Sequence, residues 1–238
     1  MKRRTLLSGA ALGLAFAQLP HAVAASANAR QHKRQYAQPS KSVPIVLPRD
    51  HGPHPNFKTE WWYFTGWFTS KDLNEPLGIQ ITFFRSAPDV PLENPSRFKP
   101  GQLLFAHAAV ALPSHGKLKH AQIIRRSGSG GVSWESAKPG EQVLNLQMPG
   151  WALNSATGEA WHCKIQTPQL GLQMRMQQTQ APWLQGENGF SRKGPDEVQS
   201  SHYITLPHLK SSGTLVLDGK TIAVDGEFWM DHEWSSTV

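Results

Sequence analysis

Residues 226–235 read Gly-Glu-Phe-Trp-Met-Asp-His-Glu-Trp-Ser, and the interpretation of the whole chain starts from them. Successive side chains of an extended strand point to opposite faces, so Trp229, Asp231 and Glu233 would share one face. The other face would hold the remaining large side chains, Phe228, Met230, His232 and Trp234. An acid flanked by aromatic rings is a candidate proton donor, because desolvation raises the pKa of a carboxyl group. The alternative is a strand end whose acids are solvated or paired with Lys or Arg.

The sequence around this stretch alternates in the same way. Apolar and polar or small side chains take turns along residues 77–85 and again along 170–177, a period of two that is typical of half-buried strands. Asp218-Gly219 is a hairpin dipeptide, and residues 180–200 read as a long loop. No ten-residue window shows a helical stripe. Further stretches with strand character are 61–68, 103–112, 121–126, 143–148, 151–153, 160–167, 202–207, 213–217 and 220–231.

Many short strands at near-even spacing predict an all-β sandwich or barrel. Residues 50–238 are numerous enough for one domain with a sizeable core. Bulky side chains on one face favour an antiparallel up-and-down barrel, whose interior either packs side chains or holds an apolar ligand.

The N-terminal end predicts export. Residues 1–24 have a basic start, a short apolar run and a small-x-small ending at Ala22-Val23-Ala24, as in a cleaved signal peptide. Arg3-Arg4 also resembles a twin-arginine signal. Residues 25–49 contain basic residues, no acid and no periodicity, so we expect a flexible basic leader. The mature protein is predicted to be periplasmic or secreted.

Charge argues against a nucleic-acid partner. The net charge is +7, but eight of the 24 Lys and Arg lie in residues 1–49, which contain no acid. The 16 that remain in residues 50–238 face all 17 acids, so this part is close to neutral, at −1. A nucleic-acid-binding body would have a basic stripe of its own. Contact of the basic leader with an anionic membrane surface is an alternative to a solvated leader.

Cys163 is the only cysteine, which excludes an internal disulfide and a cysteine-cluster zinc site. We expect it to lie within a strand as a small apolar residue. A metal site made of His107, His202, His232 and Glu60 lacks a spacing such as His-x-His. No metal and no cofactor are therefore predicted.

Two motifs resemble a known family. Residues 54–66 read His-Pro-Asn-Phe-Lys-Thr-Glu-Trp-Trp-Tyr-Phe-Thr-Gly, and together with residues 226–235 they are similar to the lipocalin-like AttH-type domain shared with carotenoid 1,2-hydratases (hydroxyneurosporene synthases). Weaker similarities are at 83–85 and 105–107. The resemblance implies two consecutive lipocalin-like barrels, with residues 226–238 near their junction. Residues 50–238 would be the first barrel. The sequence ends at Val238, where the family would continue into the second, so we expect either a truncated sequence or a departure from the family's pattern.

The resemblance also implies a chemistry. Hydration of an isoprenoid double bond needs an acid to protonate the alkene, electron-rich rings to stabilise the cation, and a positioned water. Asp231 matches the family's acid, Trp229 would support the cation, and His202 would position the water or orient the acid. The other candidates for an apolar ligand's site are Glu60, Trp61, Trp62, Tyr63, Arg85, Tyr203 and Trp234.

Each candidate also has a plainer interpretation. Trp61 and Trp62 are core residues more often than parts of a cation cage, and Glu60 is expected to form a salt bridge with Arg85 in the mouth of the barrel. Two functions therefore stay open. One is a hydratase acting on an apolar polyene or isoprenoid, and the other is a non-catalytic periplasmic lipid-handling partner of an ABC-type exporter permease.

Overall fold

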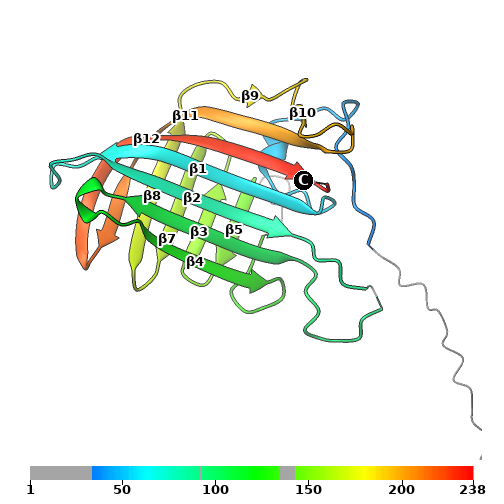
Figure 1. The fold of residues 1–238 in the computed structure, drawn as a ribbon, viewed down its shortest axis with the longest axis horizontal. Helices are drawn as coiled ribbons and strands as arrows, with labels where there is room; N and C mark the ends of the chain where they lie inside the picture. The colour runs from blue at the N-terminus through cyan, green and yellow to red at the C-terminus, as the bar shows by residue number, and fades with distance from the viewer. Residues whose placement is uncertain (1–33, 92, 135–142, 238) are drawn as a thin grey trace, which may run out of the picture. The chain divides into compact units, whose positions relative to one another are not determined.

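The computed structural model of the protein describes residues 34–91, 93–134 and 143–237 (Figure 1). The predicted signal peptide and residues 25–33 of the predicted leader lie outside the described residues. Two short 3-10 helices, η1 (Arg49–His51) and η2 (Pro113–His115), interrupt the connecting segments. In the described ranges, no helix is both long and apolar enough to cross a membrane.

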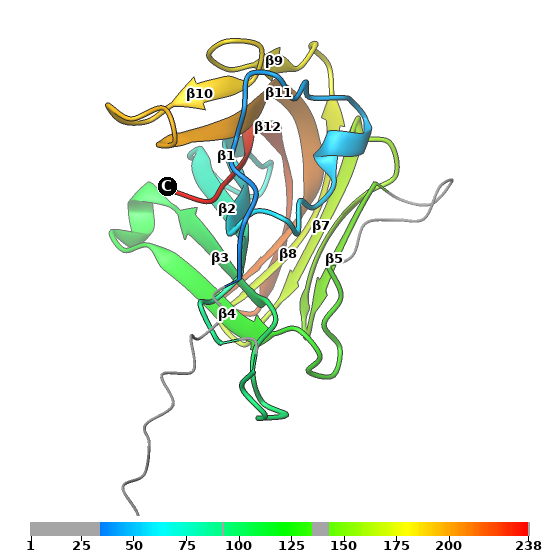
Figure 2. The same cartoon turned by 90° about the vertical axis from the view of Figure 1, so that its right-hand side faces the viewer.

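The rest of the regular structure is antiparallel β-sheet. The sheet order is β4-β3-β2-β1-β12-β11-β8-β7-β6-β5, with the short strands β9 and β10 paired to β11. This sheet curls into a nearly closed barrel (Figure 2), so the predicted all-β, lipocalin-like barrel is confirmed. The strands are β1 (Thr59–Thr69), β2 (Leu77–Ser86), β3 (Leu103–Ala111), β4 (Lys119–Arg126), β5 (Leu144–Met148), β6 (Trp151–Ser155), β7 (Ala160–Gln166), β8 (Leu170–Gln178), β9 (Trp183–Leu184), β10 (Phe190–Arg192), β11 (Ser200–Leu217) and β12 (Lys220–Ser235).

The hairpin of β11 and β12 is the longest in the fold, and the predicted Asp218-Gly219 turn joins its strands. Both turn residues have positive φ, 49° and 78°, as the tight hairpin turn requires. The register of the hairpin shifts by one residue between Leu206 and Leu209. Such a bulge bends the strand and changes which residues of β11 face β12.

Two glycines let β1 and β12 approach each other closely. A Cβ added at Gly66 would lie 2.0 Å from the Glu227 oxygen, and one at Gly226 would lie 2.1 Å from the Trp67 oxygen. A side chain at either position would clash with backbone, and glycine in a strand commonly marks such close approaches and bends. The two glycines therefore help the sheet to curl.

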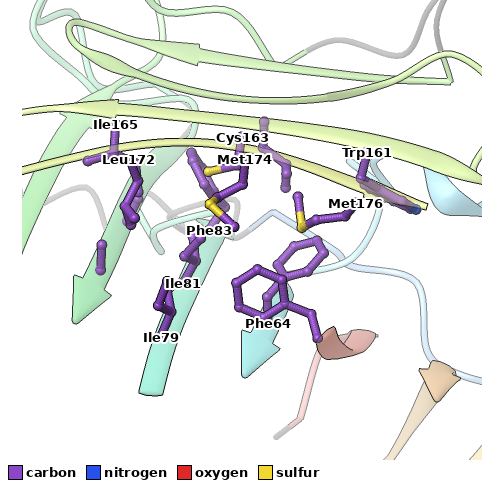
Figure 3. Packing of buried hydrophobic residues seen from close by; sticks show 14 of the residues in the cluster. Phe64, Ile79, Ile81, Phe83, Trp161, Cys163, Ile165, Leu172, Met174 and Met176 are labelled. Atoms are coloured by element: carbon purple, nitrogen blue, oxygen red, sulfur yellow. The ribbon is translucent and has the colours of Figure 1, made fainter. Parts of the chain in front are cut away.

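Apolar side chains from opposite walls meet inside the barrel (Figure 3). The Phe64 ring of β1 contacts the Trp161 ring of β7 at 5.9 Å between centroids, although these strands are not neighbours in the sheet. Phe83 of β2 and Trp151 of β6 meet in the same way at 6.3 Å. Side chains therefore fill the barrel interior where these rings meet. Of the two alternatives predicted from the alternation, this is the interior that packs side chains. Cys163 is buried in this core within β7, as expected, and burial raises the pKa of its thiol.

Segments outside the main strands lie against the barrel. The Tyr36 hydroxyl donates to the Ala87 carbonyl at 3.1 Å, and Lys41 pairs with Glu187 at 2.9 Å. The second half of the predicted leader therefore contacts the barrel. The predicted loop 180–200 contains β9 and β10. Both pair with the first residues of β11, and they run beside it in Figure 1.

Candidate functional site

Strand β12 presents different side chains to its two faces, as the sequence predicted. Phe228, Met230 and His232 are buried toward the barrel interior, and Trp229 and Asp231 are half-buried on the outer face. The residues singled out from the sequence therefore form two separate groups. One is a charged cluster buried inside the barrel near one end, and the other is an aromatic surface on the outside of the sheet.

The inner cluster centres on the fully buried carboxylate of Glu60. The His54 backbone N–H and the Arg85 Nε donate to Oε2 at 2.8 and 2.9 Å. Oε1 lies 2.6 Å from Nδ1 of His54 and 2.9 Å from Nε2 of His232. The expected Glu60–Arg85 salt bridge is present, with both side chains fully shielded from solvent. A buried charge needs this degree of hydrogen bonding to be tolerated.

Arg85 connects the carboxylate to the segment that precedes β1. Its guanidinium also donates to Gln102 Oε1 at 2.9 Å and to the carbonyls of His54 and Phe57 at 2.7 and 3.0 Å. Arg85 thereby links β2 to residues 54–57 and fixes that segment at this end of the barrel.

The electrostatics of the cluster follow from its burial and its charges. Burial alone would raise the pKa of Glu60, but the charge of His54, hydrogen bonds from His232 and His54, and the charge of Arg85 hold it far below its usual range. Burial would lower the pKa of His54, but the carboxylates of Glu60 and Asp50 raise it above the ordinary value. His232 behaves in the opposite way, because complete burial lowers its pKa despite Glu60.

Tryptophan rings hold the histidines in place. Trp234 stacks on His54 at 3.7 Å with 6° between planes, and Trp62 stacks on His232 at 4.7 Å. The His202 ring also stacks on Trp234, at 5.4 Å between centroids. The predicted site residues Glu60, Arg85, Trp62, Trp234 and His202 thus come together here, within a rigid network.

His54, Glu60 and His232 are also the residues that could hold a metal ion, since one donor atom from each lies within 4.8 Å of the others. However, Glu60 Oε1 occupies the point on which both imidazoles converge, at hydrogen-bond distance from each. A transition-metal ion would need to be about 2.0–2.2 Å from all three donors. The carboxylate would have to move aside, so the geometry shown is that of a hydrogen-bonded cluster.

The outer group centres on Asp231, which a short chain of hydrogen bonds holds in place. Gln185 Nε2 donates to the Thr205 hydroxyl at 3.0 Å, and that hydroxyl donates to Asp231 Oδ1 at 2.6 Å. Because Gln185 supplies a proton to the Thr205 oxygen, the hydroxyl proton is free to point at the carboxylate. Sequence reasoning missed both Thr205 and Gln185.

Aromatic side chains surround Asp231 on this face. Tyr63 of β1 is directly opposite Asp231, and Trp61 is opposite Glu233. Tyr203 of β11 flanks Glu233 from the other side. Trp229, on the same face of β12, is met edge-on by Trp183 of β9 at 5.7 Å. We call Trp61, Tyr63, Tyr203, Trp229 and Asp231 the outer aromatic face.

Two charged residues at the rim of the outer aromatic face neutralise each other. Lys193 Nζ lies 2.8 Å from Glu233 and 4.4 Å from the centre of the Tyr203 ring. Burial, reinforced by the negative charge of Asp231, raises the pKa of Tyr203 to about 12, so its hydroxyl stays protonated at neutral pH. Asp231 has no comparable cation among the salt bridges of the described chain.

Comparison with known proteins places the chain in a family. The sequence profile described as AttH-like matches residues 38–238. A solved structure from Nitrosomonas europaea, described as an AttH protein, is 37% identical with a TM-score of 0.72, and the match covers 85% of this chain and 59% of that one. Kievitone hydratase from Nectria haematococca is 13% identical with a TM-score of 0.59, over 87% of this chain and 57% of that one.

The chain thus spans less than two thirds of the length of these two proteins. A search of curated proteins found no significant match. The family profile covers most of the sequence, including both long motifs. The protein is a member of the AttH-like family, with a lipocalin-like barrel.

Proposed function

We propose that the protein binds an apolar, isoprenoid- or lipid-like molecule on the outer aromatic face and that Asp231 there acts as the general acid for hydration of a carbon–carbon double bond. One observation carries this proposal. Within the described residues, a carboxylate that forms no salt bridge lies among four aromatic side chains, on the face of β12 that is turned away from the barrel core. Similarity in fold to a protein named as a hydratase agrees with this chemistry.

The reaction needs few parts. The acid form of Asp231 gives its proton to one alkene carbon, and the other carbon becomes a tertiary cation. The rings of Trp229 and Tyr63 would stabilise this cation by about 1–2 kcal/mol each once water is excluded. Water adds to the cation and loses a proton, which restores the acid. Glu233 is held by Lys193 and by the Ser201 hydroxyl, so it is less suited to the acid's role.

The test is incorporation of ¹⁸O from labelled water into a panel of polyenes and shorter terpenes, followed by mass spectrometry. Asp231→Asn keeps the shape of the side chain but cannot supply the proton, so hydration should fall by about 10²–10⁴-fold. Glu233→Gln is the matched control on the same face and should stay within a few-fold of wild type. Labelling by Asp231→Asn at the wild-type rate would exclude Asp231 as the acid.

A second function is favoured by the hydrogen bond from Thr205. This bond joins Asp231 of β12 to Thr205 of β11, which gives the carboxylate a structural role that needs no proton transfer. The alternative proposal is therefore a non-catalytic lipid-handling protein, exported to the periplasm and working with an ABC-type exporter permease, in which the outer aromatic face only binds. It predicts ligand binding by wild type, no ¹⁸O incorporation with any substrate, and no effect of Asp231→Asn beyond stability or partner binding.

A further inference from the structure

A groove of about 670 Å³ lies at the seam of the barrel, beside the edge strand β4. Its walls are residues 121–125 of β4, Phe105 and His107 of β3, and the turns at 149–151 and 166–169. This volume lies within the range of small-molecule sites in proteins. We call it the seam groove.

The seam groove continues the outer aromatic face. Phe84 of β2 is opposite Trp61, and its ring stacks on Phe105 at 4.7 Å with 13° between planes. His107, the other β3 residue of the groove, lies 5.5 Å from the same Phe84 ring. Aromatic residues therefore occupy this outer side of β1, β2 and β3, from the outer aromatic face to the groove.

The strand register gives the length of this path. Asp231 pairs with Tyr63, Tyr63 with Thr82, Thr82 with His107, and His107 with Gln122. Four steps between neighbouring strands, each about 4.8 Å, amount to about 19 Å. A molecule that touches both Asp231 and the groove must therefore be elongated.

The charge of the groove indicates which end group a bound molecule would carry. Arg125 is the arginine among the residues that line it, and none of those residues is Asp or Glu. The guanidinium donates to the neighbouring Ile124 carbonyl at 2.8 Å, and it forms no salt bridge within the described ranges. The cation of another exposed residue of β4, Lys119, is by contrast neutralised by Asp218 at 3.0 Å. Apolar walls with one unpaired cation suit a chain that ends in an anion.

We propose that the seam groove binds the far end of an elongated amphiphile whose end group is a carboxylate or a phosphate ester recognised by Arg125. The apolar chain then follows Ile124, Phe105 and Phe84 toward Asp231. This inference rests on the proposed function of the outer aromatic face, but it concerns different residues and can fail separately.

The test measures binding by isothermal titration calorimetry with four saturated probes, so that no turnover interferes: palmitate, hexadecyl phosphate, hexadecanol and octanoate. Palmitate or hexadecyl phosphate should bind about ten- to a hundredfold more tightly than hexadecanol, as expected for a hydrogen-bonded charge. The tighter of the two identifies the end group. Arg125→Gln should remove this preference. Arg175→Gln is the matched control and should preserve it, because Arg175 lies on the outer side of β8 and likewise forms no salt bridge with the described residues.

A second variant separates the two proposals. Tyr63→Ala changes the outer aromatic face, so it should weaken the binding of palmitate, which is long enough to reach that face. The affinity for octanoate should stay unchanged, because octanoate fills only the groove. Equal binding of palmitate and hexadecanol, or no effect of Arg125→Gln, would overturn the inference about the groove. If Tyr63→Ala affects no probe while Arg125→Gln still does, the groove stands and the outer aromatic face is wrong.

Discussion

Replacing Glu60 with Gln tests whether the inner cluster holds this end of the barrel together. The substitution preserves the shape of the side chain but places an amide NH₂ where one carboxylate oxygen accepts two hydrogen bonds. It also leaves the fully buried Arg85 without its counter-ion. Removing one partner of a buried pair typically costs about 3–5 kcal/mol, a large part of a domain's stability.

Urea unfolding followed by tryptophan fluorescence measures this loss. The matched control is Asp218→Asn, which breaks the exposed pair with Lys119 and should cost far less than the loss of a buried pair, because solvent screens an exposed pair. The double variant Glu60→Gln/Arg85→Met should be about 1–3 kcal/mol more stable than the sum of the two single changes, because the isolated charge is gone. A loss for Glu60→Gln no larger than for Asp218→Asn would refute the role given to the cluster.

Two further predictions concern pH and export. Burial lowers the pKa of His51 from 6.5 to about 3, so native His51 stays neutral where the unfolded chain takes up a proton. The stability that neutral His51 contributes is therefore fully present above pH 6.5. Below pH 6.5, this group lowers the free energy of unfolding by about 1.4 kcal/mol per pH unit, down to about pH 3. His51→Gln should reduce the slope of unfolding free energy against pH in that window, and the exposed control His120→Gln should not. For export, N-terminal sequencing of the periplasmic fraction should begin near Ala25 or Asn28, and a cytoplasmic protein that retains Met1 would contradict the signal peptide.

Much of the fold could be predicted because alternation is a local property. The period of two along residues 77–85 and 226–235 determines which side chains face the core, and the structure shows the same faces. The Asp218-Gly219 turn fixes the start of the β11–β12 register for the same reason. No contact between distant residues is needed for either inference.

The partner of Asp231 could not be predicted in this way. Counting back from the Asp218-Gly219 turn places Leu206 opposite Asp231, whereas the bulge at Pro207 and His208 places Thr205 there. Pro207 hints at an irregularity, because it cannot donate a ladder hydrogen bond. The direction of the shift depends on packing across the sheet, which the sequence does not show.

The division of the site into two groups follows from strand geometry, although each motif contains residues of both groups. Glu60 lies next to Trp61 in sequence, but their side chains face the interior and the outside respectively. His54 reaches Glu60 from a segment that is not a strand, so no periodicity predicts the contact. The sequence reasoning missed this contact, which only the closeness of His54 and Glu60 along the chain could have suggested.

The most direct test of an outer-face site compares two neighbouring residues of β12 that face opposite ways. Trp229→Leu removes a ring from the outer aromatic face, and Met230→Leu is a volume-conserving change in the interior. With the fluorescent polyene parinaric acid as probe, we expect Trp229→Leu to weaken binding by about tenfold, because the ring's apolar contact with the polyene is lost, and Met230→Leu to leave it unchanged. Weaker binding by Met230→Leu together with wild-type affinity of Trp229→Leu would place the ligand inside the barrel and contradict an outer-face site.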